Sequence, residues 1–324
     1  MHAIARKLLV AALLVGAGVP AGRAQSFPSR PITMIVPFPA GGPSDVLARV
    51  MSQGMRAALG QPIVVENVSG AAGTIGVNRA QRATPDGYTI VLGNLGTHVF
   101  NGAVYPLGYD LVSDFAPVAQ LPANHHLIVV GNAVPATNLG ELIAWVRSQG
   151  EKVTAGTAGP GSPSHLSALY FQKTVGARFQ LVPYRGTPQA MQDLVAGQID
   201  LLFDQVSSAI SFVRSGRIRA LALTSATRLA AAPDIPTVDE AGLPGFYTTQ
   251  WFGLWAPKGT PENVVRTLNA AVVETLADPA IRARLSDLGA AIPSREQQTP
   301  EALTRLQKAE TDKWWPIIKA AEIR

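Results

Sequence analysis

Short apolar runs alternate with segments of helical periodicity along most of the chain. The first run, 32–37, precedes Val46, Leu47, Val50, Met51 and Met55, whose spacing places them on one face of a helix. Further apolar runs predict strands at 63–66, 88–92, 127–130, 153–155, 179–182, 199–203 and 218–223. Helices are predicted between them at 75–82, 139–148, 164–174, 188–195 and 208–215. Buried strands that alternate with helices predict an α/β fold of mostly parallel sheet flanked by helices.

The C-terminal part of the chain differs, because only helical patterns follow the run 251–257. Helices are predicted there at 261–276, 279–288 and 300–321. These segments include too few strands for a separate α/β domain, so we expect them to pack against the first domain. With crossovers near 121–126 and 246–251, the predicted organisation is two similar lobes. Lobe 1 comprises 25–123 and 249–324, and lobe 2 comprises 124–248.

The N-terminus has the pattern of a secretory signal peptide at 1–24. Arg6 and Lys7 precede the apolar run 8–19, which is too short to span a bilayer, and Gly22 and Ala24 supply the small residues of a cleavage site. The alternative is a membrane anchor that stays attached. We expect cleavage after Ala24 and a periplasmic mature protein, since no other segment has the length and apolar continuity of a membrane helix.

Composition and motifs exclude several classes of function. When Arg6, Lys7 and Arg23 leave with the signal peptide, the 27 Lys and Arg fall to 24 against 22 Asp and Glu, so the net charge falls to +2. No stretch resembles a basic arm, so nucleic acid is not an expected partner. Cysteine is absent, which excludes disulfides and thiol chemistry. Because the histidines have no metal-ligand spacing and nucleotide-binding fingerprints are missing, neither a metal nor a cofactor is expected.

Two glycine-rich turns, 37–45 and 156–165, each follow a predicted strand and precede a predicted helix. A helix start has unpaired N–H groups and partial positive charge, so it attracts anions without a cationic side chain. In open α/β sheets, ligands bind beyond the carboxyl ends of strands, where these turns lie. The pair therefore predicts that a small acid is held from both sides, although proline at a helix start is also ordinary helix architecture. A third turn, 67–74, has the same position after a strand.

Other side chains allow a second hypothesis, a periplasmic serine hydrolase. Ser162 or Ser164 could be combined with His165 and Asp204, but the Gly-x-Ser-x-Gly turn is absent. Ser162 is better explained as a helix N-cap. Asp204 ends a predicted strand, where it could accept from a ligand amine or hydroxyl or cap the next helix. The pair 125–126, both histidines, lies at a crossover, where imidazoles could bind a polar ligand or simply lie in a surface loop.

A series of motifs resembles the Bug-type extracytoplasmic solute receptors, the substrate-binding proteins of tripartite tricarboxylate transporters. The run Ile-Val-Pro-Phe-Pro-Ala-Gly-Gly-Pro-Ser-Asp at 35–45 carries the first part of the resemblance. Matching motifs follow in order at 84–89, 156–166, 182–186, 203–204, 221–225, 234–237, 240–245, 256–257 and 259–261. The resemblance thus covers essentially the whole mature chain.

The resemblance implies a two-lobed periplasmic binding protein fold, type II-like, that closes on a small carboxylate: a di- or tricarboxylate, an acidic amino acid or an aromatic acid. It implies no catalysis, a monomer, and presentation of the ligand to the membrane subunits of a transporter. A receptor for a membrane sensor, without transport, is a further alternative. The implied ligand-binding residues are Phe38, Ala40, Gly41, Gly42, Ser44, Asp45, Thr157, Gly159, Gly161, Ser162, His165 and Asp204.

This chain departs from the family pattern at several positions. Val68, Ser69 and Ala72 replace an Arg, a Pro and a Gly of the third turn, and Gly102 stands where Pro is frequent. His125 occupies a crossover position that is often small or apolar in relatives. These departures concern the far end of the ligand rather than the turns that hold its carboxylate.

Overall fold

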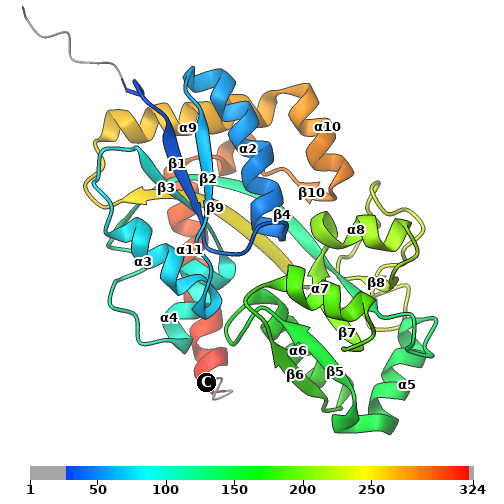
Figure 1. Cartoon of the computed structure of the whole chain (residues 1–324). Coiled ribbons are helices and arrows are strands. Elements are labelled where there is room, and N and C mark those ends of the chain that lie inside the picture. Colours follow the sequence, from blue (N-terminus) through cyan, green and yellow to red (C-terminus); the bar gives the residue numbers. More distant parts are fainter. Residues whose placement is uncertain (1–26, 321–324) are drawn as a thin grey trace, which may run out of the picture.

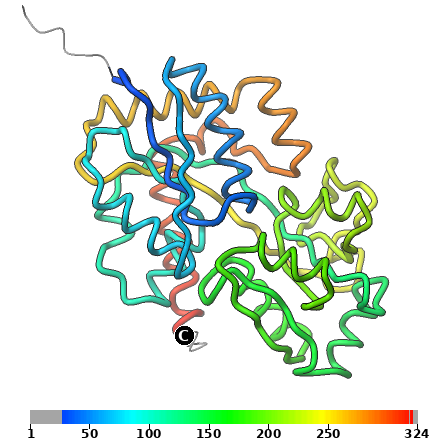
Figure 2. The backbone as a smooth tube through the Cα atoms, viewed as in Figure 1, coloured from blue at the N-terminus to red at the C-terminus, as the bar shows by residue number. Residues whose placement is uncertain are grey.

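A computed structural model describes residues 27–320 and has an α/β architecture in which one long mixed sheet runs through two lobes (Figure 1). The strand order is β2-β1-β3-β9-β4-β7-β5-β6, with β8 and β10 pairing with β4. Figure 2 shows lobe 1, blue to cyan with orange and red, beside the green to yellow lobe 2. The predicted signal peptide lies outside the described residues.

Lobe 1 is built on three parallel strands. β1 (Ile32–Val36) pairs with β2 (Ile63–Asn67) on one side and with β3 (Thr89–Asn94) on the other. Successive side chains of a strand point to opposite faces, so Met34 and Ile35 enter different apolar cores. The helices of this part are α2 (Pro43–Leu59), η1 (Ala71–Gly73), α3 (Thr74–Gln81), η2 (Gly96–Phe100) and α4 (Asn101–Val104).

Lobe 2 repeats this plan with β5 (Thr154–Thr157) between β6 (Gln180–Pro183) and β7 (Leu201–Gln205), all parallel. It also has two cores, one on each face of the sheet, with Phe203 in one and Leu202 in the other. The remaining elements are α5 (Leu139–Gln149), η3 (Gly150–Lys152), α6 (Pro163–Val175), α7 (Thr187–Val195), α8 (Val206–Arg214) and β8 (Arg219–Leu223).

The lobes are joined by the long strand β4 and by the segment that leads back into β9. β4 (Phe115–Val130) pairs with β9 (Thr249–Pro257) in lobe 1, and its far end pairs with β7 and β8 in lobe 2. The α/β class is confirmed, but the sheet is mixed rather than mostly parallel, because β4 and β9 run antiparallel to each other and to β7 and β3 respectively. The exact residues at which the lobes divide stay a prediction.

The sequence patterns predict a strand over only residues 127–130 of β4 and no strand within β9. The first half of β4 includes Pro117, Pro122 and Asn124, and its register with β9 shifts twice, so its period-two pattern is broken. β9 is buried on both faces from Gln250 to Pro257 and therefore has no alternation to detect.

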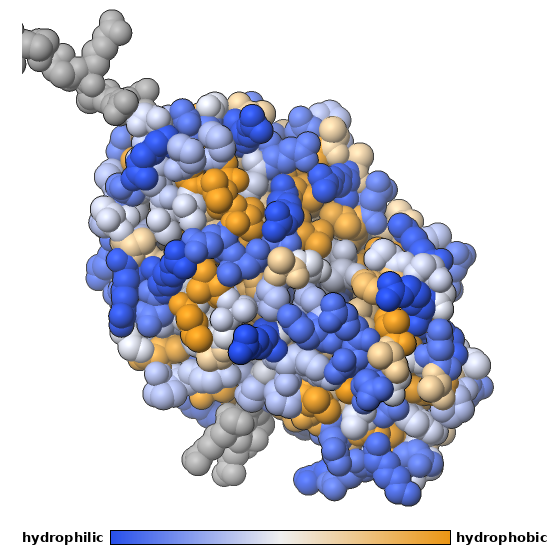
Figure 3. All heavy atoms as spheres, viewed as in Figure 1, coloured by the Kyte–Doolittle hydropathy of each residue, from blue (hydrophilic) through white to orange (hydrophobic). Residues whose placement is uncertain are grey.

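The C-terminal helices cover lobe 1. α9 (Glu262–Ala277) packs on α2 through a core that includes Leu268 and Val272. After α10 (Pro279–Asp287), β10 (Ala290–Ala291) pairs with β4, and η4 (Arg295–Gln297) leads into α11 (Pro300–Ala320), which contacts β4. None of the helices within residues 27–320 combines the length and apolar character needed to cross a bilayer. On the face in Figure 3, apolar residues form separate patches among polar ones.

Candidate functional site

A cavity lies where the two lobes meet, and the starts of four helices surround it. It encloses about 390 Å³ of space outside protein atoms, part of it open to solvent. Lobe 1 contributes the start of α2, while lobe 2 contributes the starts of α6, α7 and α8. The lining residues are Phe38, Pro39, Gly42, Pro43, Ser44, Asn94, His126, Ala158, Pro163, Ser164, Thr187, Pro188, Phe203, Asp204 and Gln205. None of them is Lys or Arg.

The first glycine turn leads into α2 with its backbone N–H groups at the cavity. Gly42 is the N-cap, without a side-chain cap, and Pro43 begins the helix, so the first-turn N–H groups have no intrahelical acceptor. Gly41 has φ +80°, a left-handed conformation that favours glycine, and its N–H donates to Asp45 Oδ2 over 2.9 Å. The turn is thus shaped by a carboxylate on the helix that follows it.

Asp45 holds the turn in place rather than lining the cavity. Its carboxylate accepts two hydrogen bonds from Arg49, at 2.9 and 3.0 Å, and one of 3.1 Å from Asn67 Nδ2. Burial alone would raise the pKa of Asp45, but the hydrogen bonds from Arg49, Gly41 and Asn67 keep it below its usual value. Asn67 begins the third turn, and its Nδ2 also donates to Phe38 O in the first turn. The third turn therefore supports the first but contributes no residue to the cavity lining.

The second glycine turn leads into α6 and has a similar internal network. Ser162 is the N-cap, as predicted, and its Oγ accepts from His165 N over 3.3 Å. Ser164 Oγ accepts from Ala158 N over 2.9 Å, which ties the strand end to the helix start. Gly159 and Gly161 have φ values of +90° and +78°. Here too, the turn brings a helix start to the cavity.

The structure brings four of the predicted ligand-binding residues to the cavity lining: Phe38, Gly42, Ser44 and Asp204. The others lie in the two turns without lining the cavity: Ala40, Gly41, Asp45, Thr157, Gly159, Gly161, Ser162 and His165. Several of these fix the turn geometry, as Asp45 and Ser162 do. Whether each contacts a ligand stays a prediction.

Asp204 is the one carboxylate among the lining residues, and it is 2% exposed. Its Oδ2 accepts from Ser208 Oγ over 2.8 Å in the first turn of α8, whereas Oδ1 has no hydrogen-bond partner within residues 27–320. Burial raises the pKa of Asp204 to about 6, although neighbouring donors partly offset this effect. A buried carboxylate oxygen without a partner in a cavity lining is available to accept a hydrogen bond from a ligand.

Five polar residues of the lining were not among the predicted ligand-binding residues: Asn94, His126, Ser164, Thr187 and Gln205. Of these, Ser164 had been considered only as part of the hydrolase hypothesis. Thr187 and Gln205 stand at the starts of α7 and α8, each after a strand, so the signal used for the two glycine turns could have found them. His126 was noted only as one of two crossover histidines. Of that pair, His125 lies outside the cavity lining, where its Nδ1 and Thr249 Oγ1 are 3.0 Å apart.

His126 is oriented by a chain of hydroxyl groups on the segment that leads into β9. Its Nδ1 lies 3.1 Å from Thr248 Oγ1, which donates its proton to Thr224 Oγ1 over 2.9 Å. Because the Thr248 proton is used in this way, Nδ1 of His126 is the donor of the first pair. His126 Nε2 therefore carries the lone pair, and it has no partner among the described residues. Burial lowers the pKa of His126 to about 4, so the ring is neutral at pH 7.

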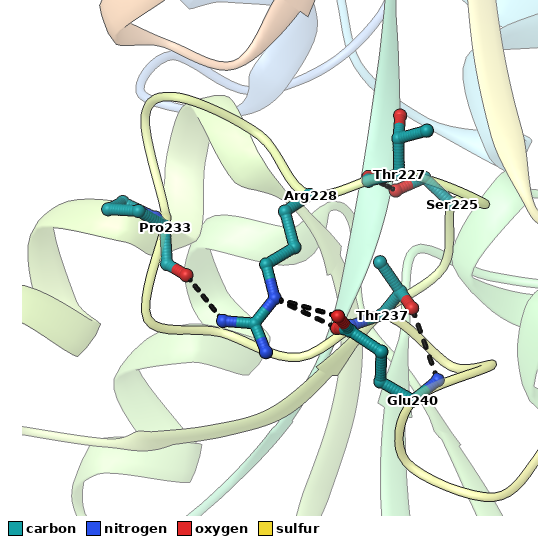
Figure 4. Close-up of polar contacts among 6 residues, drawn as sticks. All are labelled: Ser225, Thr227, Arg228, Pro233, Thr237 and Glu240. Carbon is teal, nitrogen blue, oxygen red and sulfur yellow. Dashed lines mark hydrogen bonds and ion pairs between the residues drawn. The ribbon is translucent and has the colours of Figure 1, made fainter.

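The loop between Thr224 and Thr248 has its own fixed geometry (Figure 4). Arg228 Nε donates to both carboxylate oxygens of Glu240, at 3.0 and 2.9 Å, and its Nη1 donates to Pro233 O over 2.7 Å. Glu240 Oε2 also accepts from Thr237 N over 2.8 Å. These contacts close the loop on itself and so hold the segment that positions His126.

The side chains of the hydrolase hypothesis are not arranged as a nucleophile and base. Ser162 Oγ lies 3.2 Å from Ser164 Oγ, and His165 Nδ1 accepts from Gly161 N over 3.4 Å. Asp204 interacts with Ser208 instead of a histidine. In the part of the chain that the structure describes, no group of three or more His, Cys, Asp or Glu residues could hold a metal ion.

Several solved structures are closely similar to this chain, among them the following three. The periplasmic binding protein BugD is 38% identical, with a TM-score of 0.88, covering 92% of this chain and 99% of its own. MatC from Rhodopseudomonas palustris, solved with bound malate, is 41% identical with a TM-score of 0.85, and the match covers 90% and 100%. The R. palustris protein Rpa4515, solved with adipate, is 34% identical with a TM-score of 0.87, and the match covers 92% and 99%.

The predicted periplasmic binding protein fold is therefore confirmed. These structural matches cover 90–92% of the chain, which is about the length over which its motifs resemble the Bug-type receptors. Residues 47–323 match the family described as the tripartite tricarboxylate transporter family receptor, called TctC. This protein belongs to the TctC family of tripartite tricarboxylate transporter receptors.

Proposed function

We propose that this protein is a non-catalytic receptor that binds a small carboxylate in the cavity between its lobes. The observation that carries the proposal is the ring of four helix starts around a cavity without a Lys or Arg lining residue. Helix N-termini supply donors and partial positive charge, so they can hold a carboxylate by main-chain hydrogen bonds. The malate and adipate bound by two relatives belong to the same chemical class.

Ligand binding is proposed to favour the closed arrangement of the lobes. A carboxylate that accepts from α2 on one side and from α6 or α7 on the other links both lobes, so it binds the closed form more tightly than an open one. Micromolar affinity corresponds to about 8 kcal/mol, which a few charge-assisted hydrogen bonds in a desolvated cavity can supply. The closed receptor would then present its ligand to the membrane subunits of a transporter.

Export is part of the same proposal. We infer cleavage after Ala24, which would release the mature protein into the periplasm, where receptors of this family act. Mass spectrometry of protein purified from the periplasmic fraction would give the mature N-terminus directly. A retained N-terminal segment would contradict the cleavage site.

The test is calorimetric titration with succinate, malate, adipate and benzoate, with succinamide as an uncharged control. At least one acid should bind with micromolar or tighter affinity, and the amide should not. A matched pair of variants then tests the role of the α2 start: Ser44→Asp introduces a negative charge at the cavity, and Ser44→Asn has nearly the same shape without it. We expect Ser44→Asp to weaken binding at least 100-fold and Ser44→Asn less than tenfold. Binding of succinamide in preference to every acid would contradict the proposal.

A further inference from the structure

We propose that lobe 2 selects carboxylates bearing a hydrogen-bond donor, an ammonium or a hydroxyl group, on the carbon next to the carboxylate. This inference rests on the proposed function and adds to it the substrate class. It arises from buried acceptors without hydrogen-bond partners that lobe 2 contributes to the cavity lining.

Two acceptors define this part of the lining, which we call the acceptor wall: His126 Nε2 and Asp204 Oδ1. Both atoms are buried, both residues line the cavity, and neither atom has a hydrogen-bond partner within residues 27–320. Gln205, which also lines the cavity, is paired directly with His126 across β4 and β7, and its Oε1 is likewise buried and unpartnered. An amide can turn either its oxygen or its nitrogen to the cavity, whereas His126 and Asp204 offer acceptors.

His126 Nε2 remains a hydrogen-bond acceptor at neutral pH. The Nδ1–H of the same ring is used by Thr248, whose own proton is used by Thr224, so the tautomer is fixed and Nε2 keeps its lone pair. Asp204 Oδ2 accepts from Ser208, and Oδ1 has no partner at hydrogen-bond distance within residues 27–320. The Thr187 hydroxyl and the Gln205 N–H are near enough to lower the pKa of Asp204 in part, but Oδ1 can still accept from a ligand. Because the pKa of Asp204 is about 6, its carboxylate is ionised at pH 7.5.

The cavity lining therefore requires two kinds of group on the ligand. The helix starts offer N–H donors, which suit a carboxylate. The acceptor wall offers lone pairs and one negative charge. A second carboxylate placed against it would be repelled, and a methylene group there would leave the buried acceptors without hydrogen bonds. A ligand with an ammonium or hydroxyl donor beside its carboxylate meets both requirements.

The experiment compares sets of acids that differ only in that substituent. At pH 7.5 the first set is succinate, L-malate and L-aspartate; the second is glutarate, L-2-hydroxyglutarate and L-glutamate; the third is phenylacetate, L-mandelate and L-phenylglycine. In the set that binds most tightly, the hydroxy or amino acid should bind at least about tenfold more tightly than its parent, since a hydrogen bond to a charged group has roughly that effect. Comparison of the hydroxy and amino members identifies the donor.

Two near-isosteric variants locate the effect at the acceptor wall. Asp204→Asn removes the charge and adds a donor, and His126→Phe removes the acceptor but keeps an aromatic ring. Each should reduce the preference for the substituted acid at least about fivefold while the affinity for the parent acid changes less. Asp193→Asn, whose carboxylate accepts from Tyr184 outside the cavity lining, is the matched control and should leave the preference unchanged.

The outcomes separate this inference from the proposed function. A parent acid that binds as tightly as its hydroxy and amino partners would overturn the inference and leave the carboxylate receptor in place. A parent acid whose binding tightens below pH 6 would also overturn it, because Asp204 would then act as a donor in its protonated form. Failure of all three sets, with binding of neutral compounds only, would overturn both.

Discussion

The hydroxyl group of Tyr105, at the end of α4, donates a 2.7 Å hydrogen bond to the backbone carbonyl of Pro160 in the second glycine turn. The bond joins lobe 1 to lobe 2 beside the cavity. Gly161 lies at the same contact between the lobes, since a Cβ added to it would be 3.1 Å from Asn101 Oδ1. The lobes are therefore held together by direct contacts as well as by β4 and the segment that leads into β9.

Tyr105→Phe should weaken ligand binding about two- to tenfold, because it removes one hydrogen bond that exists only while the lobes are closed. The free energy of unfolding without ligand should change by less than about 1 kcal/mol. Titration calorimetry measures the first effect and urea unfolding the second. Tyr109→Phe is the matched control, since Tyr109 donates to Thr74 O within lobe 1. Equal losses of affinity in both variants would contradict a role in closure.

Gly186→Ala should hinder closure directly. A Cβ at Gly186 would lie 2.5 Å from Pro39 Cδ across the lobe interface, whereas the extended φ of −177° suits any residue. Opening of the lobes relieves this overlap, so we expect affinity to fall at least about tenfold with little change in stability. X-ray scattering with saturating ligand should show a larger radius of gyration than the unmodified protein. Gly108→Ala, with no atom near its added Cβ, should behave as the unmodified protein.

Asp45→Asn should destabilise lobe 1 by about 1–2 kcal/mol, because the variant loses the charge that accepts from Arg49, Gly41 and Asn67. The pKa of Asp45 is lowered in the folded protein, so its contribution is present above pH 3.8 and lost below it. Urea unfolding at pH 7 gives the value. Asp312→Asn breaks an exposed ion pair with Lys308 and should change stability by less than about 0.5 kcal/mol. Similar losses in the two variants would contradict this account of Asp45.

Acid should destabilise the protein from pH 6.5 downward through the buried His98 and His126 and the half-buried His165. Burial lowers the pKa of His98 to about 3 and those of His126 and His165 to about 4. The unfolded chain binds protons near pH 6.5 that the folded chain does not, so each histidine contributes up to about 1.4 kcal/mol per pH unit to the loss. Unfolding in urea at pH 7.5, 6.5 and 5.5 measures the slope.

Protonation of Asp204 should have the opposite effect on stability as the pH falls over the same range. Its folded pKa of about 6 exceeds the usual value of 3.8, so protonation of the folded protein adds stability as pH falls through 6. Asp204→Asn should therefore make the free energy of unfolding fall more steeply as the pH is lowered, and His98→Gln should make it fall less steeply. Stability that does not change between pH 7.5 and 5.5 in the unmodified protein would contradict both assignments.

Much of the fold could be predicted from local patterns. The strands β1, β2, β3, β5, β6, β7 and β8 and the helices that follow them have apolar runs and proline or serine helix starts that mark them in the sequence. β4 and β9 could not be predicted in full, because prolines and register shifts break one pattern and burial on both faces removes the other. Their antiparallel pairing depends on contacts between residues more than a hundred positions apart, which no local pattern contains.

The candidate site divides in the same way. The sequence by itself determined that glycine turns at 37–45 and 156–165 end in helix starts, because glycine, proline and capping serine act within a few residues of themselves. Only the tertiary structure decided that these starts share one cavity with those of α7 and α8, and that Asp45 turns to Arg49 while His126 and Asp204 face the space between the lobes. The reason is physical: a side chain's direction and burial depend on which distant elements pack against it, and these in turn decide which polar atoms remain to meet a ligand.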